Sequence, residues 1–214
     1  MIVALDVFGR SIADVLARYG PSARARLAPH FQRAGVAYPP REIAILAFKD
    51  EERVAIWARG ANGRWHFIRR YPILAASGHA GPKLRQGDLQ VPEGIYRIAH
   101  LNPNSSYHLS MKVSYPNDFD RRMAARDRRT RLGGDIFIHG RDVSIGCIAI
   151  GDRAIEELFT LVAQTGHGKV KVIIAPNDLR DEGAILHEDA PRWAGALYRE
   201  LQAALADFPL RMER

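Results

Sequence analysis

The sequence predicts an α+β fold, in which a mostly β domain carries helical extensions at its N- and C-terminal ends. Two observations predict it. Short apolar runs of strand length, separated by turn residues, fill the chain from about residue 43 to 178. Apolar residues at helical spacing occupy the two ends, at 7–34 and 194–205. We therefore divide the chain into an N-terminal helical extension (1–42), a central domain (43–178) and a C-terminal helical extension (179–214).

The N-terminal extension is expected to form two helices and a connector. Apolar residues recur at helical spacing up to Gly20-Pro21, and this pair is expected to end the first helix. Ser22 is a suitable N-cap for a second helix, and Gly35 is suited to end it. The Tyr-Pro-Pro segment at 38–40 is expected to be a rigid link to the central domain.

Seven segments of the central domain are expected to be strands, and one is expected to be a helix. Hairpin turns at 49–51 and 60–63 are expected to join the first three strands. A stretch rich in glycine and proline, 75–94, is expected to be a loop. Asp152 is a suitable N-cap for an amphipathic helix at 154–162. The expected strands are 43–48, 53–58, 65–68, 95–98, 107–111, 135–138 and 170–174.

Composition and charge bear on partners and location. The formal net charge is +7, which suits either a solubilising surface or attraction to an anionic partner. The basic residues are spread along the chain without a nucleic-acid-binding motif, so no nucleic acid partner is expected. No apolar run approaches the roughly 20 residues that a membrane span needs. The first eight residues are apolar but include Asp6, which does not match a signal peptide, so the chain is expected to be either cytoplasmic or a trimmed form.

The single cysteine, Cys147, is the strongest candidate for chemistry. Only a few per cent of a free thiol is thiolate at neutral pH, so a nucleophilic cysteine needs a base or a positive environment. His139 lies eight positions upstream, and a turn can bring its ring to the thiol. The helix expected after Cys147 would favour a thiolate if the sulfur lies close to its N-terminus. The pair predicts nucleophilic catalysis with Cys147 as nucleophile and His139 as base.

The residues between this pair suit an oxyanion site. Gly140 and Gly146 can adopt positive φ and leave backbone N–H groups able to bind the negative oxygen of an acyl-transfer intermediate. Ser144 can hold the loop or the imidazole by hydrogen bonding. Asp142 is a further candidate for orienting the base.

Two other interpretations of the pair stay open at this level. Cysteine is among the most frequently buried residues, so the pair can be a buried thiol and a structural histidine. A zinc site with His139, Cys147, His167 and His187 as ligands is the other rival. No CxxC or HxxxH pair supports it, so no metal is expected.

The segments around the pair resemble a known family. The His-Gly pair at 139–140, followed by Ser-x-Gly-Cys at 144–147, looks like the active-site motif of the L,D-transpeptidase catalytic domain, or YkuD domain. The glycine-rich segment 81–96 resembles the other signature of that family. The resemblance covers roughly residues 43–178. Three segments are most similar to the YafK-like branch, namely 108–110, 114–117 and 144–150.

This resemblance implies a fold, an activity and a location. It implies a mostly β domain in which Cys147 is acylated by a peptidoglycan peptide stem containing meso-diaminopimelate, with His139 as base. The acyl group then passes to an amine, in L,D-transpeptidation, or to water, in hydrolysis. No cofactor is implied, and the location implied is the periplasm or cell envelope. The YafK-like branch implies cutting at diaminopimelate, including release of a protein attached to the wall.

Two departures from the family pattern make hydrolysis at least as strong an expectation as crosslinking. The typical transpeptidase has a longer loop between the His and the Cys, where seven residues intervene here. It also carries a His before the Gly-Cys pair and an Arg two places after the Cys, where this chain has Ile145 and Ala149. These changes remove polar groups that can hold a donor peptide. They leave a second hypothesis, a non-catalytic module that binds the cell wall.

Four further residues are candidates for binding the substrate. Lys83 and Arg85 lie in the glycine-rich signature and can meet substrate carboxylates. His108 and Tyr115 lie in segments that resemble the YafK-like branch and are expected to line the cleft. The alternative is that the basic side chains are only solvated and that Tyr115 packs as an aromatic turn residue.

Overall fold

A computed structural model describes residues 9–181, 183 and 190–210. Within them, one curled sheet has the strand order β3-β2-β1-β9-β5-β6-β7-β8-β4. None of the described helices combines the length and apolar content needed to cross a membrane. The helices are α1 (Ile12–Ala34), α2 (Asp118–Arg126), α3 (Asp152–Thr165) and α4 (Ala194–Leu205), with a short 3-10 turn at His167–Lys169. The strands are β1 (Ile43–Phe48), β2 (Arg53–Arg59), β3 (Trp65–Pro72), β4 (Ala75–Ala76), β5 (Gly94–Asn102), β6 (Ser110–Val113), β7 (Phe137–His139), β8 (Ile148–Ala149) and β9 (Val170–Ala175).

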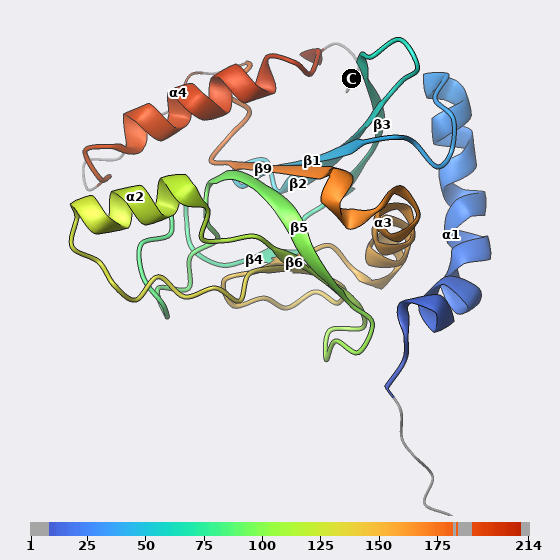
Figure 1. The fold of residues 1–214 in the computed structure, drawn as a ribbon, viewed down its shortest axis with the longest axis horizontal. Helices are drawn as coiled ribbons and strands as arrows, with labels where there is room; N and C mark the ends of the chain where they lie inside the picture. The colour runs from blue at the N-terminus through green and yellow to red at the C-terminus, as the bar shows by residue number, and fades with distance from the viewer. Residues whose placement is uncertain (1–8, 182, 184–189, 211–214) are drawn as a thin grey trace, which may run out of the picture.

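Helices cover both faces of the central strands, with α2 and α4 on one side and α1 and α3 on the other (Figure 1). Strand β1 is buried along its whole length. Ile43 and Ile45 pack with residues of α1 and α3, whereas Ala44 and Leu46 pack with residues of α4. A strand covered on both faces needs apolar residues at every position, which explains the unbroken apolar run in the sequence.

Helix α1 is continuous, so the expected break at Gly20-Pro21 is wrong. Ser11 caps its start, and Ser22, expected to cap a second helix, lies inside it. Gly35 ends the helix with φ 65°, as expected. The buried face of α1 runs past the break point and packs against α3. We attribute the continuity to this tertiary packing, which offsets the backbone hydrogen bonds that proline removes.

A buried carboxylate also fixes α1 to the central domain. Glu157 of α3 has no exposed side-chain surface and forms an ion pair with Arg26 of α1. The same carboxylate lies 3.1 Å from the Arg69 guanidinium and accepts a hydrogen bond from the Tyr71 hydroxyl at 2.8 Å, both from β3. The N-terminal extension is therefore held by charge as well as by apolar packing.

The predicted elements of the central domain are largely confirmed, with exceptions at short or charged segments. The strands starting at Ile43, Arg53 and Trp65 follow one another as antiparallel hairpins, as expected. The expected strand at 107–111 is wrong for its first three residues, because β6 begins only at Ser110. The sequence does not predict β4, β8 or α2. Two-residue strands are too short to show a period, and α2 is dominated by charged residues.

The start of α3 fixes the loop that follows β7. The helix at 154–162 is confirmed, but Gly151 takes the N-cap position that was expected for Asp152. Asp152 lies in the first turn instead, and its carboxylate accepts the Arg141 backbone N–H at 2.7 Å. The Gly151 N–H also donates to the Arg141 carbonyl at 3.0 Å. These bonds tie the loop between β7 and β8 to the helix behind it.

Candidate active site

Two neighbouring parallel strands place Cys147 and His139 on one face of the sheet. Strands β7 and β8 pair with His139 opposite Ala149. Cys147 directly precedes β8, and its sulfur lies 3.7 Å from the Asp135 carbonyl, just before β7. Cys147 lies two residues before Ala149, and side chains two residues apart on a strand lie on the same face. Cys147 and His139 are therefore diagonal neighbours on one face. No hydrogen bond joins thiol and ring among the described residues, and such contacts are commonly long before substrate binds.

The His139 imidazole is buried, with 2% of its surface exposed, and is held in one tautomer. Its Nδ1 lies 2.7 Å from the Gly140 carbonyl. A carbonyl only accepts, so Nδ1 carries the proton and Nε2 keeps a free lone pair. Asp142, the other candidate for orienting the ring, is exposed in the loop. Burial lowers the pKa of His139, and this outweighs the hydrogen bond to Gly140, so the ring is neutral at neutral pH.

The thiol of Cys147 is also neutral at rest. Burial raises the pKa of Cys147. The Phe137 N–H and the charge of Lys83 lower this pKa, the charge of Asp135 raises it further, and burial dominates. Helix α3 begins at Asp152, with strand β8 between it and Cys147. The proton must therefore leave the sulfur during attack, which is the task of a general base.

Gly140 is required by space rather than by a positive φ, which corrects the expectation from the sequence. A Cβ added to Gly140 would lie 2.8 Å from the Tyr107 carbonyl and 2.7 Å from the Asp152 carboxylate. The Gly140 N–H donates to the Leu109 carbonyl at 3.1 Å. Gly146 does have a positive φ of 83°, as expected, so the turn before the cysteine favours glycine for that separate reason.

Two serine hydroxyls occupy the N–H groups that were expected to bind an oxyanion. The Cys147 N–H donates to Ser144 Oγ at 3.0 Å, and Ser144 Oγ donates to the Cys147 carbonyl at 2.7 Å. The Gly146 N–H donates to Ser77 Oγ, which donates in turn to the Leu89 carbonyl at 2.7 Å. These hydroxyls hold the turn, and a substrate oxygen that uses the same N–H groups has to displace them.

A cavity of about 190 Å³ opens beside this turn, and we name it the cysteine cavity. One wall comes from the glycine-rich signature, and the other comes from the segment just before β7. Gly146 and Asp135, which flank Cys147 in space, both line it. Its lining residues are Lys83, Gln86, Gly87, Leu89, Gly133, Gly134, Asp135, Ile136, Ile145 and Gly146.

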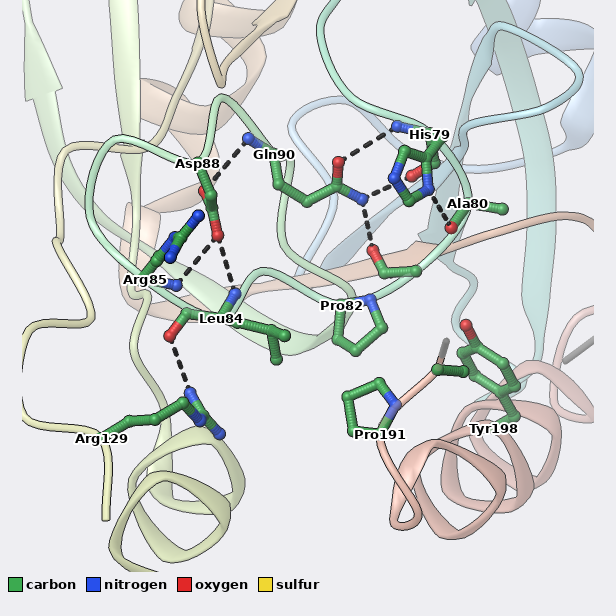
Figure 2. Close-up of a pocket in the computed structure, with 12 residues that line it drawn as sticks. His79, Ala80, Pro82, Leu84, Arg85, Asp88, Gln90, Arg129, Pro191 and Tyr198 are labelled. Carbon is green, nitrogen blue, oxygen red and sulfur yellow. Dashed lines mark hydrogen bonds between the residues drawn. The ribbon is translucent and has the colours of Figure 1, made fainter. Parts of the chain in front are cut away.

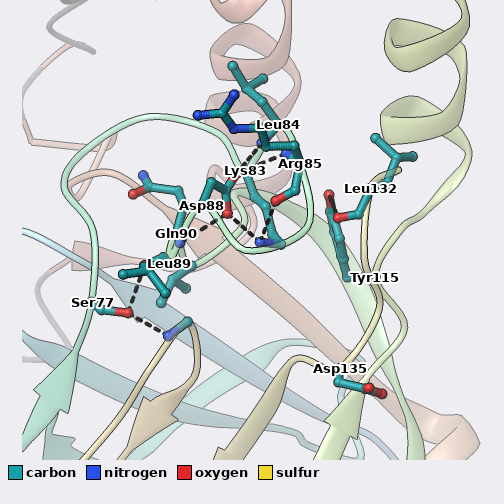
Figure 3. A network of polar contacts seen from close by, with 12 residues as sticks. Ser77, Lys83, Leu84, Arg85, Asp88, Leu89, Gln90, Tyr115, Leu132 and Asp135 are labelled. Carbon is teal, nitrogen blue, oxygen red and sulfur yellow. Dashed lines mark hydrogen bonds and ion pairs between the residues drawn. The ribbon is translucent and has the colours of Figure 1, made fainter. Parts of the chain in front are cut away.

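One carboxylate shapes the signature loop and places Lys83 in the cavity wall. Asp88 accepts the backbone N–H groups of Leu84 and Arg85 at 2.9 Å each and that of Gln90 at 3.2 Å (Figure 2). Its other contact is an ion pair with Lys83, whose Nζ also donates to the Arg85 carbonyl at 3.0 Å (Figure 3). Lys83 is only 7% exposed. The cysteine cavity therefore has a buried ammonium group in its wall.

His108 and Tyr115 are not among the residues that line the cysteine cavity. The His108 ring lies 3.1 Å from the Glu156 carboxylate of α3 and packs edge-on against Tyr19 of α1. Tyr115 is buried, and its hydroxyl donates to the Leu132 carbonyl at 3.2 Å (Figure 3). His108 thus lies at a helix interface, and Tyr115 supports the segment that leads into the cavity wall.

Several residues of the site are missed by sequence reasoning. The Tyr107 ring lies over His139, with ring centroids 4.6 Å apart. Ser77 holds Gly146, and Lys112 forms a 2.9 Å ion pair with the Asp135 side chain beside the sulfur. Only the order of strands β6, β7, β8 and β4 brings these residues to the site, and sequence periodicity does not give that order. Tyr107 had a weak signal, as the start of an alternating segment.

The metal interpretation gains no support from the described residues, where no three potential ligand side chains gather at one point. The ring of His167, one of the zinc candidates, lies 3.1 Å from the Ile98 carbonyl. His187 lies outside the described residues.

Comparison with known proteins shows the family of the chain. Residues 42–174 match the family model of the YkuD L,D-transpeptidase catalytic domain. The chain belongs to the YkuD family of L,D-transpeptidase catalytic domains. Over 151 residues it is 32% identical to "Putative L,D-transpeptidase YafK" of Escherichia coli K12, and it is equally similar to the protein of that name in strain O157:H7. The match covers 68% of this chain and 58% of the relative, so the chain spans a little over half of that relative's length.

Solved structures share the fold. The helical cell shape determining protein Pgp2 from Campylobacter jejuni superimposes with a TM-score of 0.52 and 22% identity, over 64% of this chain and 48% of that chain. Its K307A mutant gives a TM-score of 0.53 and 21% identity, over 77% and 55% of the two chains. At these identities the likeness shows the fold alone, which is the expected α+β fold.

Proposed function

We propose that this chain is a peptidoglycan-directed cysteine acyl-transfer enzyme acting at peptide stems that contain diaminopimelate. The observation that carries the proposal is the placement of Cys147 and His139 on one face of adjacent strands, with Gly146 and Asp135 beside Cys147 lining the cysteine cavity. Membership of the YkuD family supports the substrate class. Lys83 in the cavity wall gives two of its three N–H donors to Asp88 and the Arg85 carbonyl, and we assign the third to a substrate carboxylate.

In the proposed first step, Cys147 is acylated. Its sulfur attacks the carbonyl carbon next to the diaminopimelate α-carbon while Nε2 of His139 takes the thiol proton. The carbonyl–nitrogen bond then breaks, and the imidazolium returns the proton to the leaving amine. The product is a thioester on Cys147. The tautomer of His139, with Nδ1 bound to the Gly140 carbonyl, supports this role because Nε2 is left as acceptor.

In the proposed second step, the thioester is resolved. Water or an amine attacks the thioester carbonyl, His139 takes a proton from the attacking group, and the sulfur leaves and regains that proton. Hydrolysis is the outcome we favour. Ala149, where the typical family member has Arg, is buried beside His139, and Ile145, where it has His, is 74% exposed at the cysteine cavity. Neither residue offers the polar group with which a typical transpeptidase can hold its donor peptide.

We further propose that residues 43–178 form the catalytic unit and that the protein works in the periplasm or cell envelope, where its wall substrate lies. A protein attached to the wall is a second proposed substrate, released by the same cleavage at diaminopimelate. The alternative, a non-catalytic module, would bind the same stems without forming a thioester.

The test is a digest of purified muropeptides followed by mass spectrometry. Cys147→Ala and His139→Gln are expected to abolish turnover while circular dichroism stays unchanged. His100→Gln is the matched control, because His100 is an exposed histidine on β5, and full turnover is expected. Turnover by Cys147→Ala would refute the nucleophile. Stem binding by the wild type with no product would establish the binding module instead.

A further inference from the structure

The C-terminal helix closes a second cavity, distinct from the cysteine cavity (Figure 2). Its volume is about 450 Å³, within the range of roughly 300–1,000 Å³ that is typical of small-ligand sites. One wall is the signature loop, and the other is Tyr198 of α4 with the two residues 190–191. The family match ends at residue 174, so the second wall lies outside the family domain. We name this space the α4 cavity.

The walls of the α4 cavity are apolar over much of their surface. Pro82 and Pro191 approach each other from the two walls, as Figure 2 shows. Leu84, Ala80 and Ala190 extend this apolar lining. A ligand body without charge therefore fits between the walls.

The carboxylates nearest this cavity are already paired with lysines of the protein. Asp88, which lines it, accepts the three backbone N–H groups described above and pairs with Lys83. Glu93 does not line the cavity, and its Oε1 binds the Lys49 ammonium at 3.1 Å and the Gly81 N–H at 2.6 Å, while its buried Oε2 accepts no hydrogen bond within the described residues. These carboxylates have internal partners, so the cavity does not favour a cationic ligand.

The cavity has N–H donors that are free to bind a ligand, and they belong to two arginines. Within the described residues, no hydrogen bond or ion pair engages the Arg85 guanidinium, which lines the cavity at one end. Arg129 lines the same end, held in place by the Leu84 carbonyl at 2.8 Å and by Asp127. Figure 2 shows both arginines at the end away from Tyr198. Arg129 uses three of its five N–H donors, two on Asp127 and one on the Leu84 carbonyl, and keeps one on each terminal nitrogen. Together with the Arg85 guanidinium, these remaining donors match the planar geometry of a carboxylate.

From this combination we propose that the α4 cavity binds the carboxyl-terminal end of a short peptide. The carboxylate pairs with Arg85 and Arg129, and the chain behind it packs between Pro82 and Pro191. We assign the ligand to a peptide stem of peptidoglycan, and this choice of source rests on the proposed function. The preference for a peptide carboxylate rests only on the residues that line the cavity. The Asp88–Lys83 ion pair links the two cavities, because Asp88 lines one and Lys83 lines the other.

The test is a binding titration of the full chain carrying Cys147→Ala, which prevents turnover. The probe is the stem tripeptide that ends in meso-diaminopimelate, and the readout is the backbone amide resonances of Gly81 and Tyr198, which line only the α4 cavity. Saturable shifts of both resonances are expected. Arg85→Ala is expected to raise the dissociation constant about tenfold, and an amide in place of the terminal carboxylates is expected to do the same.

Two further variants separate the α4 cavity from other surfaces. Ala190→Phe fills the space and is expected to abolish the shifts. Arg126→Ala removes an exposed arginine of α2 that does not line the cavity, and binding within twofold of the parent is expected. The proposal is overturned if the two resonances do not respond, or if Arg85→Ala and Arg126→Ala behave alike. Turnover by Cys147→Ala would refute the proposed function but not this site, because binding is measured without catalysis.

Discussion

The Tyr107 ring lies over the His139 imidazole with ring centroids 4.6 Å apart and planes inclined by 37°. Tyr107 is 39% exposed and His139 only 2%, so the tyrosine covers the base on its solvent side. Burial is the cause that lowers the pKa of His139. The cover therefore contributes to keeping the base in its neutral, proton-accepting form.

Removing this cover tests its role. Tyr107→Ala is expected to raise the pKa of His139 towards its ordinary value of 6.5, because water then reaches the ring. Turnover at pH 6 is expected to fall by up to about fourfold, because a ring with a pKa of 6.5 is about one-quarter neutral at that pH. An NMR titration of the His139 ring checks the shift. Tyr107→Phe keeps the ring and should leave the titration unchanged; equal pKa values in all three proteins would contradict the covering role.

The pH dependence follows from two opposite shifts. The pKa of His139 is lowered and that of Cys147 is raised. The imidazole and the thiol are therefore both neutral at every pH between these two pKa values. We expect turnover to be flat across neutral pH, to fall on the acid side only below 6.5, and to change on the alkaline side only above the ordinary thiol value. Alkylation by iodoacetamide needs the thiolate, so at pH 6 it is expected to be no faster than for a model thiol. Much faster alkylation at pH 6 would reveal a thiolate–imidazolium pair and contradict this ordering.

Gly140→Ala tests whether the turn at His139 has room for a side chain at position 140. Gly140→Ala forces a Cβ against the Tyr107 carbonyl and the Asp152 carboxylate, so the His139 turn has to move. We expect a loss of about 1–3 kcal/mol in the free energy of unfolding and a loss of most turnover. Urea denaturation measures the first effect. Gly168→Ala is the control, because an added Cβ there meets no atom within 4 Å; if both variants are equally stable, the space argument is wrong.

The buried Glu157 predicts how firmly the N-terminal helix belongs to the fold. Glu157→Ala removes the carboxylate partner of Arg69, leaves Arg26 with Glu156 alone, and leaves the buried Tyr71 hydroxyl without its acceptor, so it is expected to cost about 3–5 kcal/mol. Glu42 and Arg59 form an ion pair with both side chains more than 40% exposed, so Glu42→Ala is expected to cost less than about 1 kcal/mol. Thermal or urea denaturation compares the two. Similar costs would mean that the α1 contact is only peripheral.

Local patterns were enough to predict the elements that bury apolar residues at a clear period. Strand β1 and helix α4 match their expected bounds because each presents a long apolar pattern. The break at Gly20-Pro21 fails because the packing of α1 on α3 overrides a local preference. Strands β4 and β8 have two residues each and exist only through their pairing, which no local window shows.

The residues of the candidate site also fall into two groups, those that the sequence suggests and those that only the structure shows. Residue type and spacing are enough to select Cys147 and His139 as candidates, because a nucleophile and a base have to be chemically distinctive, and the structure places the two on one face of adjacent strands. Tyr107 and Ser77 act through packing and hydrogen bonds across strands, and the sequence does not give their neighbours. The sequence also does not give the protonation state at rest, since burial of the sulfur depends on the assembled sheet.

The most direct test of the central claim is intact-protein mass spectrometry during turnover of muropeptides, with peptide mapping of any adduct. The account predicts an acyl adduct on Cys147 that forms and decays with turnover, and none in Cys147→Ala. Product formation that continues in Cys147→Ala, or an adduct that maps to another residue, would contradict it.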